Sequence, residues 1–199
     1  MEYFVYCRDR PGTLELRLAL GEEHWSFMDD YAKAMIARGP TFAEDGDTPT
    51  GSLHIVDLPD VDAVRAFAYQ EPYYRAGVFG DVTIRRWRNS LGRTMWEYGG
   101  DHDAMHFLVI GHARANVGAV GDDLRAARRV YLAERGHAGR VIVCGPLLSD
   151  DGSRWAGTAA TLALESRAAV EELLAGDPLV TAGPYEQIEI HPWCFGGRR

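Results

Sequence analysis

Three short segments of the chain are apolar at every position rather than at alternate positions. They are Tyr3–Tyr6, Phe107–Ile110 and Val141–Cys144. A strand of an antiparallel sheet with one wet face alternates apolar and polar side chains, so continuous apolarity predicts strands that are covered on both faces. We therefore expect two sheets packed face to face, with helices on their outer surfaces.

Two stretches of the first half have the periodicity of amphipathic helices. Glu22–Arg38 carries apolar residues at helical spacing, and Gly39-Pro40 follows it as a predicted helix stop and turn. A short strand is expected to begin at Thr41-Phe42. The second stretch, Asp60–Gln70, has its apolar residues in phase, and Pro72 marks its end.

The second half of the chain repeats the first. From Gly39 to Trp87, residues whose numbers differ by 106 match without a gap. The matching residues are Gly39-Pro40 with Gly145-Pro146, Asp45-Gly46 with Asp151-Gly152, Gly51 with Gly157, Pro72 with Pro178, Gly77 with Gly183, Phe79 with Tyr185, Ile84 with Ile190 and Trp87 with Trp193. So many glycines, prolines and aromatic residues at one offset indicate an internal duplication.

Each half is predicted to have the order β-α-β-β-α-β, the split βαβ or ferredoxin-like unit, which makes the fold class α+β. The remaining predicted elements are Ser52–Asp57, Val82–Trp87, Asp122–Arg135, Arg140–Leu147, Thr158–Glu165, Arg167–Ala175 and Gln187–Trp193. We assign residues 1–92 to the first repeat, 93–105 to a linker and 106–199 to the second repeat.

Composition narrows the classes of partner. Hydrophobic residues make up 46% and charged residues 25% of the 199 residues, as in ordinary globular proteins. The formal net charge of −8 argues against a nucleic-acid partner. No apolar run approaches the roughly 20 residues of a membrane helix, and no signal peptide is visible. Cys7, Cys144 and Cys194 are widely spaced and odd in number, so we expect reduced thiols and a cytoplasmic location.

The motifs together resemble the YCII-related family of the dimeric α/β-barrel superfamily, as two tandem copies. The first repeat carries the resemblance in order: Asp9-Arg10-Pro11-Gly12-Thr13-Leu14-Glu15, Arg17-Leu18-Ala19, Glu23-His24, Gly39-Pro40, Gly51-Ser52, Glu71-Pro72-Tyr73, Ala76-Gly77-Val78-Phe79 and Ile84-Arg85-Arg86-Trp87. The resemblance implies that the two repeats form an intramolecular dimeric α/β-barrel.

The resemblance also implies a His–Asp pair, with the histidine at the start of the first helix. By position, His24 is that histidine, and Glu71 stands where the family has aspartate. In the second repeat Asp177 keeps the acid, but the offset of 106 pairs His24 with Val130 and Arg17 with Asp123. We therefore expect one competent site per chain, in the first repeat.

A histidine beside a carboxylate can accept and return a proton near neutral pH. Ser52 lacks the Gly-x-Ser-x-Gly elbow of a nucleophile, so proton transfer is the natural reaction class: elimination, isomerisation or tautomerisation. Relatives in the family are associated with elimination of chloride from a chlorinated hydroxyhydroquinone. The structural alternatives are that His24 is a half-buried surface residue and that Glu71 accepts backbone N–H groups at the Pro72 turn.

Five further residues are expected to bind the substrate: Asp9, Arg17, Trp25, Ser52 and Tyr73. Arg17 and Asp9 either bind an anionic substrate or pair with each other. Trp25 and Tyr73, with Tyr3, Tyr6, Tyr74 and Phe79, either line a pocket for a planar ligand or form part of the core.

No cofactor is expected, because the sequence has no phosphate-binding loop and no convincing set of metal ligands. His102 and His106 are four residues apart, with Asp101 and Asp103 beside them, but they lie in the linker with no helix to align them.

The preferred hypothesis is a cofactor-independent lyase or isomerase acting on a small aromatic or polyketide-like molecule. His24 would be the general acid/base and Glu71 its partner. The alternative is a non-catalytic small-molecule-binding or accessory protein that uses the same cavity. A third is another chemistry on the same barrel, such as oxygenation or cyclisation. Four outward helices per chain also leave room for a homodimer.

Overall fold

The computed structural model describes residues 1–118 and 120–197, so the predicted second repeat includes positions 119, 198 and 199 that lie outside the described residues. The first half comprises β1 (Glu2–Asp9), α1 (Leu14–Ala19), α2 (Gly21–Asp30), the 3₁₀ turn η1 (Ala32–Ala34), β2 (Met35–Phe42), β3 (Pro49–Asp57), α3 (Val61–Gln70), α4 (Pro72–Arg75) and β4 (Phe79–Trp87). After η2 (Met95–Glu97), the second half comprises β5 (Met105–Ala113), α5 (Asp122–Glu134), η3 (Ala138–Arg140), β6 (Val141–Leu148), β7 (Trp155–Leu164), α6 (Arg167–Gly176), α7 (Pro178–Thr181) and β8 (Tyr185–Trp193).

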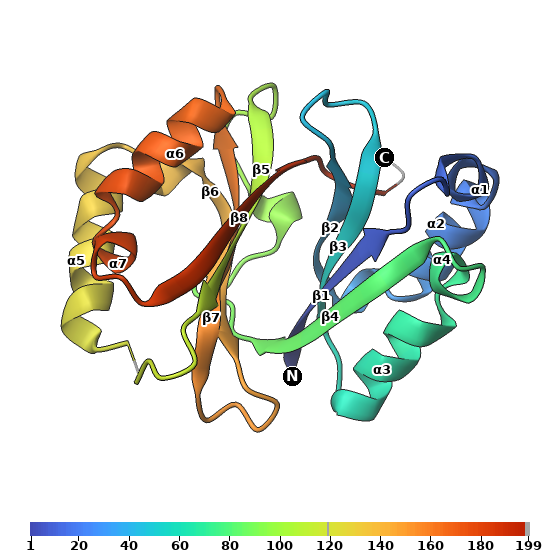
Figure 1. Ribbon diagram of the computed structural model, residues 1–199, viewed down its shortest axis with the longest axis horizontal. Helices are drawn as coiled ribbons and strands as arrows, with labels where there is room; N and C mark the ends of the chain where they lie inside the picture. The colour runs from blue at the N-terminus through green and yellow to red at the C-terminus, as the bar shows by residue number, and fades with distance from the viewer. Residues whose placement is uncertain (119, 198–199) are drawn as a thin grey trace.

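The strands form one closed antiparallel barrel in the order β1-β3-β2-β8-β5-β7-β6-β4. Each half supplies four neighbouring strands. The halves join where Thr41 of β2 pairs with Trp193 of β8, and where Arg86 and Trp87 of β4 pair with Leu148 and Leu147 of β6. The helices cover the outside of the strands on two opposite sides of the molecule (Figure 1). The predicted tandem ferredoxin-like barrel is thereby confirmed.

Burial on both faces explains the continuously apolar strands. Phe4 and Tyr6 of β1 face the barrel interior, where they join Leu108 and Ile110 of β5 in one core shared by the two halves. Tyr3, Val5 and Cys7 face the other way and pack with the helices of the first half. Because both faces of these strands are dry, neither face requires polar side chains.

The predicted helix Glu22–Arg38 is wrong in its second half. Helix α2 ends at Asp30, and Met35 already begins strand β2. Met35 packs on the helix side of the sheet, whereas Ile36 packs in the barrel interior. A strand buried on both faces does not alternate, so its apolar residues happened to continue the helical period of the preceding segment.

The repeated Gly-Pro pair is not a helix stop either, because both copies lie inside strands. A Cβ atom added to Gly39 would stand 1.9 Å from the carbonyl oxygen of Cys194, and one added to Gly145 would stand 1.8 Å from that of Arg88. At both places the end of the other repeat's last strand crosses against the glycine. The glycines are therefore required by the two joins of the barrel and not by turns.

The connection between the repeats also contributes to the core. Met95 of η2 and Tyr98 directly after it are both buried in the barrel interior. The predicted linker, residues 93–105, therefore does more than link the repeats, since two of its residues fill the space that the strands enclose. In the part of the chain that the structure describes, no helix is long and apolar enough to cross a membrane.

The strand registers show that the offset of 106 does not extend back to the first strand of each repeat. Cys7 pairs with Ser52 and Val82, and Gly111 pairs with Thr158 and Ile188. Since those partners match at 106, Gly111 is the counterpart of Cys7, at an offset of only 104. The second repeat has two more residues between its first strand and its second, which changes the expected counterparts of the site residues.

Candidate functional site

His24 and Glu71 form a buried hydrogen-bonded pair. His24 is in the first turn of α2, on the same face as the fully buried Met28 one turn later. Its Nδ1 lies 2.5 Å from Oε1 of Glu71, and the two side chains are only 10% and 2% exposed. A carboxylate buried to this degree requires such a partner.

Glu71 is held from its other side by the backbone. It follows the last residue of α3 and caps the short helix α4, where its Oε2 accepts a hydrogen bond of 2.9 Å from the backbone N–H of Tyr74. Each carboxylate oxygen therefore has its own donor. Glu71 therefore makes both contacts that the sequence analysis offered as alternatives: Oε1 contacts the histidine, and Oε2 accepts the backbone N–H at the turn.

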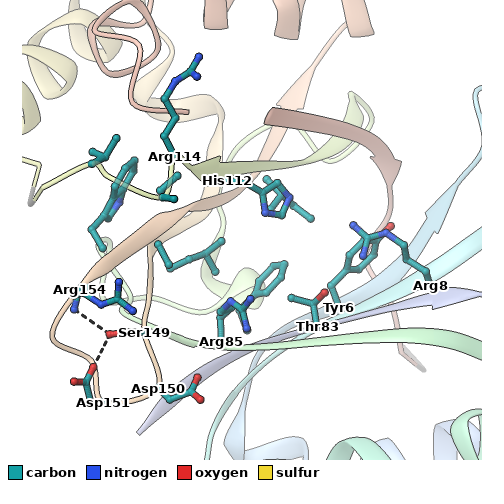
Figure 2. Close-up of a pocket in the computed structure, with 18 residues that line it drawn as sticks. Tyr6, Arg8, Thr83, Arg85, His112, Arg114, Ser149, Asp150, Asp151 and Arg154 are labelled. Atoms are coloured by element: carbon teal, nitrogen blue, oxygen red, sulfur yellow. Dashed lines mark hydrogen bonds between the residues drawn. The ribbon is translucent and has the colours of Figure 1, made fainter. Parts of the chain in front are cut away.

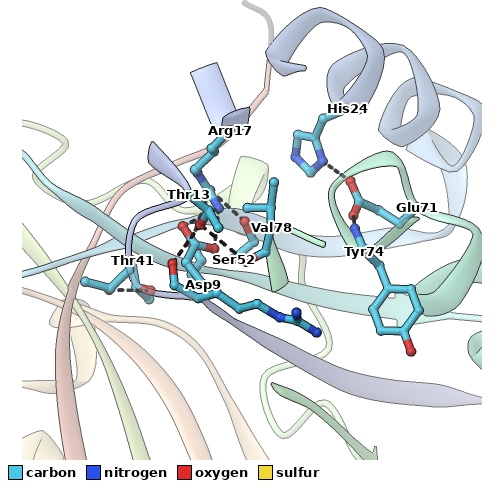
Figure 3. A network of polar contacts seen from close by, with 12 residues as sticks. Asp9, Thr13, Arg17, His24, Thr41, Ser52, Glu71, Tyr74 and Val78 are labelled. Carbon is cyan, nitrogen blue, oxygen red and sulfur yellow. Dashed lines mark hydrogen bonds and ion pairs between the residues drawn. The ribbon is translucent and has the colours of Figure 1, made fainter. Parts of the chain in front are cut away.

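The hydrogen bonds define which nitrogen of His24 is free. An ionised carboxylate only accepts hydrogen bonds, so Nδ1 of His24 is the donor and Nε2 carries the lone pair of the neutral ring. The ring stacks on Tyr73, with 4.2 Å between centroids and 9° between planes, which fixes its orientation. In Figure 3 the second nitrogen points away from Glu71, toward the side where Arg17 and Ser52 lie.

His24 lines a cavity of about 210 Å³ between the helices and the sheet of the first repeat. Four of the predicted substrate-binding residues line it as well: Arg17, Trp25, Ser52 and Tyr73. Trp25 is about half exposed at its edge. Glu71 is in contact with the cavity only through His24. Gly196 and Gly197 also line the cavity, so the end of the second repeat helps to close the site of the first.

Arg17 and Asp9 pair with each other. Nη1 of Arg17 donates to both oxygens of Asp9, at 2.8 and 3.0 Å, and Nη2 donates to the carbonyl of Gly51 and the hydroxyl of Ser52. Burial raises the pKa of Asp9, and Arg17 opposes that shift. These contacts join α1 to strands β1 and β3 (Figure 3), so of the two expectations for Arg17 the structure has the ion pair.

Two residues of the cavity were missed by the sequence analysis. His54 of β3 is buried beside His24, with 5.9 Å between ring centroids, and burial lowers its pKa well below the usual value. It could have been found, because alternate residues of a strand share a face and His54 is two residues from Ser52. Arg38 also lines the cavity. It was missed because the sequence analysis placed it at the end of the predicted helix Glu22–Arg38, whereas it lies on strand β2.

The second repeat has a different pair at the same place. Arg128 of α5 donates from Nε to Oδ2 of Asp177 at 2.8 Å, and Oδ1 of Asp177 caps α7 through the N–H of Leu179. At the corrected offset of 104, Arg128 and not Val130 is the counterpart of His24. Val130 is exposed. Applied to Arg17, the same shift indicates Gly121 in place of Asp123.

A larger cavity of about 680 Å³ opens between the two repeats at one end of the barrel (Figure 2). Its wall includes Arg8 and His112, which both bind Glu189, at 2.8 and 2.6 Å. Hydrogen bonds from His112 and His191 hold the pKa of Glu189 far below its usual range. Because Arg8 belongs to β1 and the others to β5 and β8, this cluster ties the repeats together.

The other candidates of the sequence analysis lie elsewhere. Tyr6 is on the wall of the larger cavity, whereas Tyr3 and Phe79 are part of the packed core. Within residues 1–118 and 120–197, no group of three or more histidine, cysteine or acidic side chains is arranged so that it could hold a metal ion. The spacing of His102 and His106 therefore does not produce a ligand cluster there.

Comparison with known proteins identifies the family. The profile of the YCII-related domain matches residues 1–88 and 105–194. An uncharacterized protein of Haemophilus influenzae is 34% identical over 92 residues, which cover 43% of this chain and 94% of that protein. One similar solved structure is the 5-chloro-2-hydroxyhydroquinone dehydrochlorinase from Burkholderia phenoliruptrix, in complex with 2,5-dihydroxybenzoquinone. The two sequences are 27% identical, the match covers 47% of this chain and 99% of that chain, and the TM-score is 0.43. A mutant chlorite dismutase from Candidatus Nitrospira defluvii is similar in fold alone, with a TM-score of 0.63 at 10% identity over 98% of this chain and 91% of that chain.

Proposed function

The chain belongs to the YCII-related family, and from this membership and the site of the first repeat we propose that it is a cofactor-independent proton-transfer enzyme acting on a small molecule. The observation that carries the proposal is the 2.5 Å contact between Nδ1 of His24 and Oε1 of Glu71 at the wall of a cavity. This contact leaves Nε2 as a base and supplies a negative charge to stabilise the imidazolium that forms.

The reaction follows from what one base can do. Nε2 of His24 takes a proton from a carbon or hydroxyl of the bound molecule, and the electron pair stays on the substrate. In an elimination that pair forms a double bond and expels a leaving group from the adjacent atom. In an isomerisation the double bond shifts, and His24 returns the proton at another position. A positioned base of this kind contributes roughly 10²- to 10⁴-fold in rate.

The size of the cavity favours a single ring. Cavities of roughly 150 Å³ hold one benzene molecule, and the site of about 210 Å³ has room for a ring with a few substituents. Tyr73 and Trp25 give it aromatic walls. Of the two substrate classes expected from the sequence, a small aromatic molecule fits this volume better than a polyketide-like one.

A screen for proton exchange tests the proposal. The chain is incubated in deuterated buffer with monocyclic phenols, enones and chlorinated hydroxyhydroquinones, and deuterium incorporation and chloride release are measured. We expect turnover of at least one compound, and a loss of about 10²- to 10⁴-fold in His24→Gln. The matched control is His137→Gln, a histidine of the second repeat, which should keep full activity.

The same variants discriminate the alternative function. If the cavity only binds a metabolite, no compound is turned over. His24→Gln then binds the metabolite more weakly or has a lower melting temperature. If a compound is turned over equally well by His24→Gln and the unmodified chain, His24 is not the base, and the proposal fails.

A further inference from the structure

Arg38 is a buried cation whose hydrogen-bonding capacity is largely unused. It lies on β2 and is only 8% exposed. Its Nη2 makes one long contact of 3.3 Å with Asp29, a carboxylate whose side chain is 44% exposed. Among the described residues, its Nε and Nη1 are buried and have no hydrogen-bond partner. Buried donors of this kind are rare in folded proteins, and each calls for an explanation.

Packing does not explain the choice of arginine at this position. Its counterpart at the offset of 106 in the second repeat is Cys144, so the same place in the barrel accepts a small neutral side chain. Gly196 and Gly197 run directly over Arg38, and a Cβ atom on Gly197 would stand 2.3 Å from Nη2. Residues 196 and 197 therefore lie against the guanidinium without providing a hydrogen-bond partner to Nε or Nη1.

The unused donors belong to the same cavity as His24. Arg38, His24 and His54 all line it, and Nδ1 of His54 is a further buried nitrogen with no partner in the described chain. The other arginine of the cavity, Arg17, is by contrast occupied by Asp9, Gly51 and Ser52. Arg38 thus places a positive charge, with two buried nitrogens that have no partner among the described residues, at one end of the cavity, and His24 lies at another.

We propose that Arg38 binds a carboxylate of the substrate, so that the site selects monocyclic aromatic carboxylates over their uncharged analogues. The proposal rests on the cavity of His24 being the active site. A guanidinium is the side chain best suited to a carboxylate, because its planar edges present two donors to two oxygens. Each edge of the Arg38 guanidinium has at least one nitrogen without a partner. Arg38 is a substrate-binding residue and takes no part in the proton transfer.

Calorimetric titration with a matched pair of probes tests the charge preference. Benzoate and benzamide have the same ring and nearly the same shape, and only benzoate carries a charge. We expect the unmodified chain to bind benzoate at least tenfold more tightly than benzamide. In Arg38→Met, which keeps the length of the side chain, benzoate should bind no better than benzamide, and benzamide should bind as in the unmodified chain. Arg38→Lys should keep part of the preference.

Two controls separate recognition from folding. Arg65→Met removes an exposed arginine of α3 and should leave both affinities unchanged. Arg38→Met should melt no lower than the unmodified chain, because replacing a buried, poorly paired charge by an apolar side chain of similar size is neutral or stabilising. A melting temperature several degrees lower, with the preference for benzoate intact, would assign Arg38 a structural role and overturn the proposal.

The remaining outcomes are equally decisive. The proposal fails if the unmodified chain binds benzoate no more tightly than benzamide, or if it binds neither probe. His24→Gln should lose proton transfer and keep the preference for benzoate. Failure of the enzymatic proposal would therefore be visible in His24→Gln, and failure of the carboxylate proposal in Arg38→Met.

Discussion

Arg128 occupies in the second repeat the position that His24 occupies in the first. His24 lies in the first turn of α2 and Arg128 in the middle of α5. Both bind the acid that caps a short helix later in their repeat: Glu71 of α4 for His24 and Asp177 of α7 for Arg128. A guanidinium keeps its protons at any pH a protein withstands. The same architecture thus holds a candidate base in one repeat and an ion pair in the other.

The ion pair of the second repeat should be structural. Arg128→Ala leaves the carboxylate of Asp177, which is 1% exposed, with only the N–H of Leu179, and we expect a loss of about 3 kcal/mol in the free energy of unfolding. Urea denaturation measures it. Arg125→Ala, which removes an exposed pair with Asp122 on the same helix, should cost less than about 1 kcal/mol. Equal effects of the two substitutions would contradict this account.

The charge of Glu71 should matter more to catalysis than its length. Glu71→Gln keeps the shape of the side chain but removes the negative charge that stabilises the imidazolium, and we expect kcat to fall by about 10²-fold or more. Glu71→Asp keeps the charge and the ability to cap α4, so it should retain more activity than Glu71→Gln. Steady-state kinetics on a substrate from the deuterium screen gives the comparison, with circular dichroism to confirm folding. The reverse order of activities would show that the length of the side chain matters more than its charge.

Burial of His54 predicts a specific loss of stability in mild acid. Its pKa in the folded chain lies well below 6.5 because of desolvation, so below pH 6.5 the unfolded chain takes up a proton that the folded chain does not. Stability should therefore fall as the pH falls from 6.5, by up to about 2 kcal/mol at pH 5. His54→Gln should lose less stability over the same interval in urea titrations. Parallel pH profiles for the two proteins would refute the assignment.

The joins of the barrel should not tolerate a methyl group. In Gly39→Ala the new Cβ meets the backbone of Cys194, which cannot move without opening the contact between β2 and the chain end, and we expect a loss of about 1–3 kcal/mol or more. Gly99→Ala is the control, because a Cβ there meets nothing within 4 Å. Thermal unfolding compares the stability of the two variants. If Gly39→Ala were as stable as Gly99→Ala, the backbone of Cys194 would not be packed closely against Gly39, contrary to this account.

The sequence predicted the architecture because the duplication and the dry strands are both global patterns. Eight strands in two repeats follow from glycines, prolines and a tryptophan at one offset, and the closed barrel follows from apolar runs such as Tyr3–Tyr6. The boundary between helix α2 and strand β2 was wrong, because a strand that is buried on two faces has no period of its own. Gly39 was predicted to lie in a turn, because a local sequence pattern does not reveal that Cys194, which is distant in the sequence, crosses close to it.

The site was predictable to the extent that family motifs mark it. His24, Glu71, Trp25, Ser52 and Tyr73 lie together as expected, and their catalytic and binding roles remain proposals. Arg38 and Arg128 could not be found in the same way. Recognising Arg38 as a residue of the cavity required the correct start of β2. Recognising Arg128 as the counterpart of His24 required a two-residue change of offset that only the strand registers reveal.

The most direct test of the central claim is the protonation state of His24, measured by ¹⁵N NMR of the histidine side chains. The account predicts a neutral ring with its proton on Nδ1, hydrogen-bonded to Glu71, and an unprotonated Nε2 whose signal shifts when benzoate is added. In Glu71→Gln this preference for the Nδ1–H form should weaken. A proton found on Nε2 of the neutral ring, or a ring unaffected by Glu71→Gln, would contradict the claim that Glu71 prepares His24 as the base.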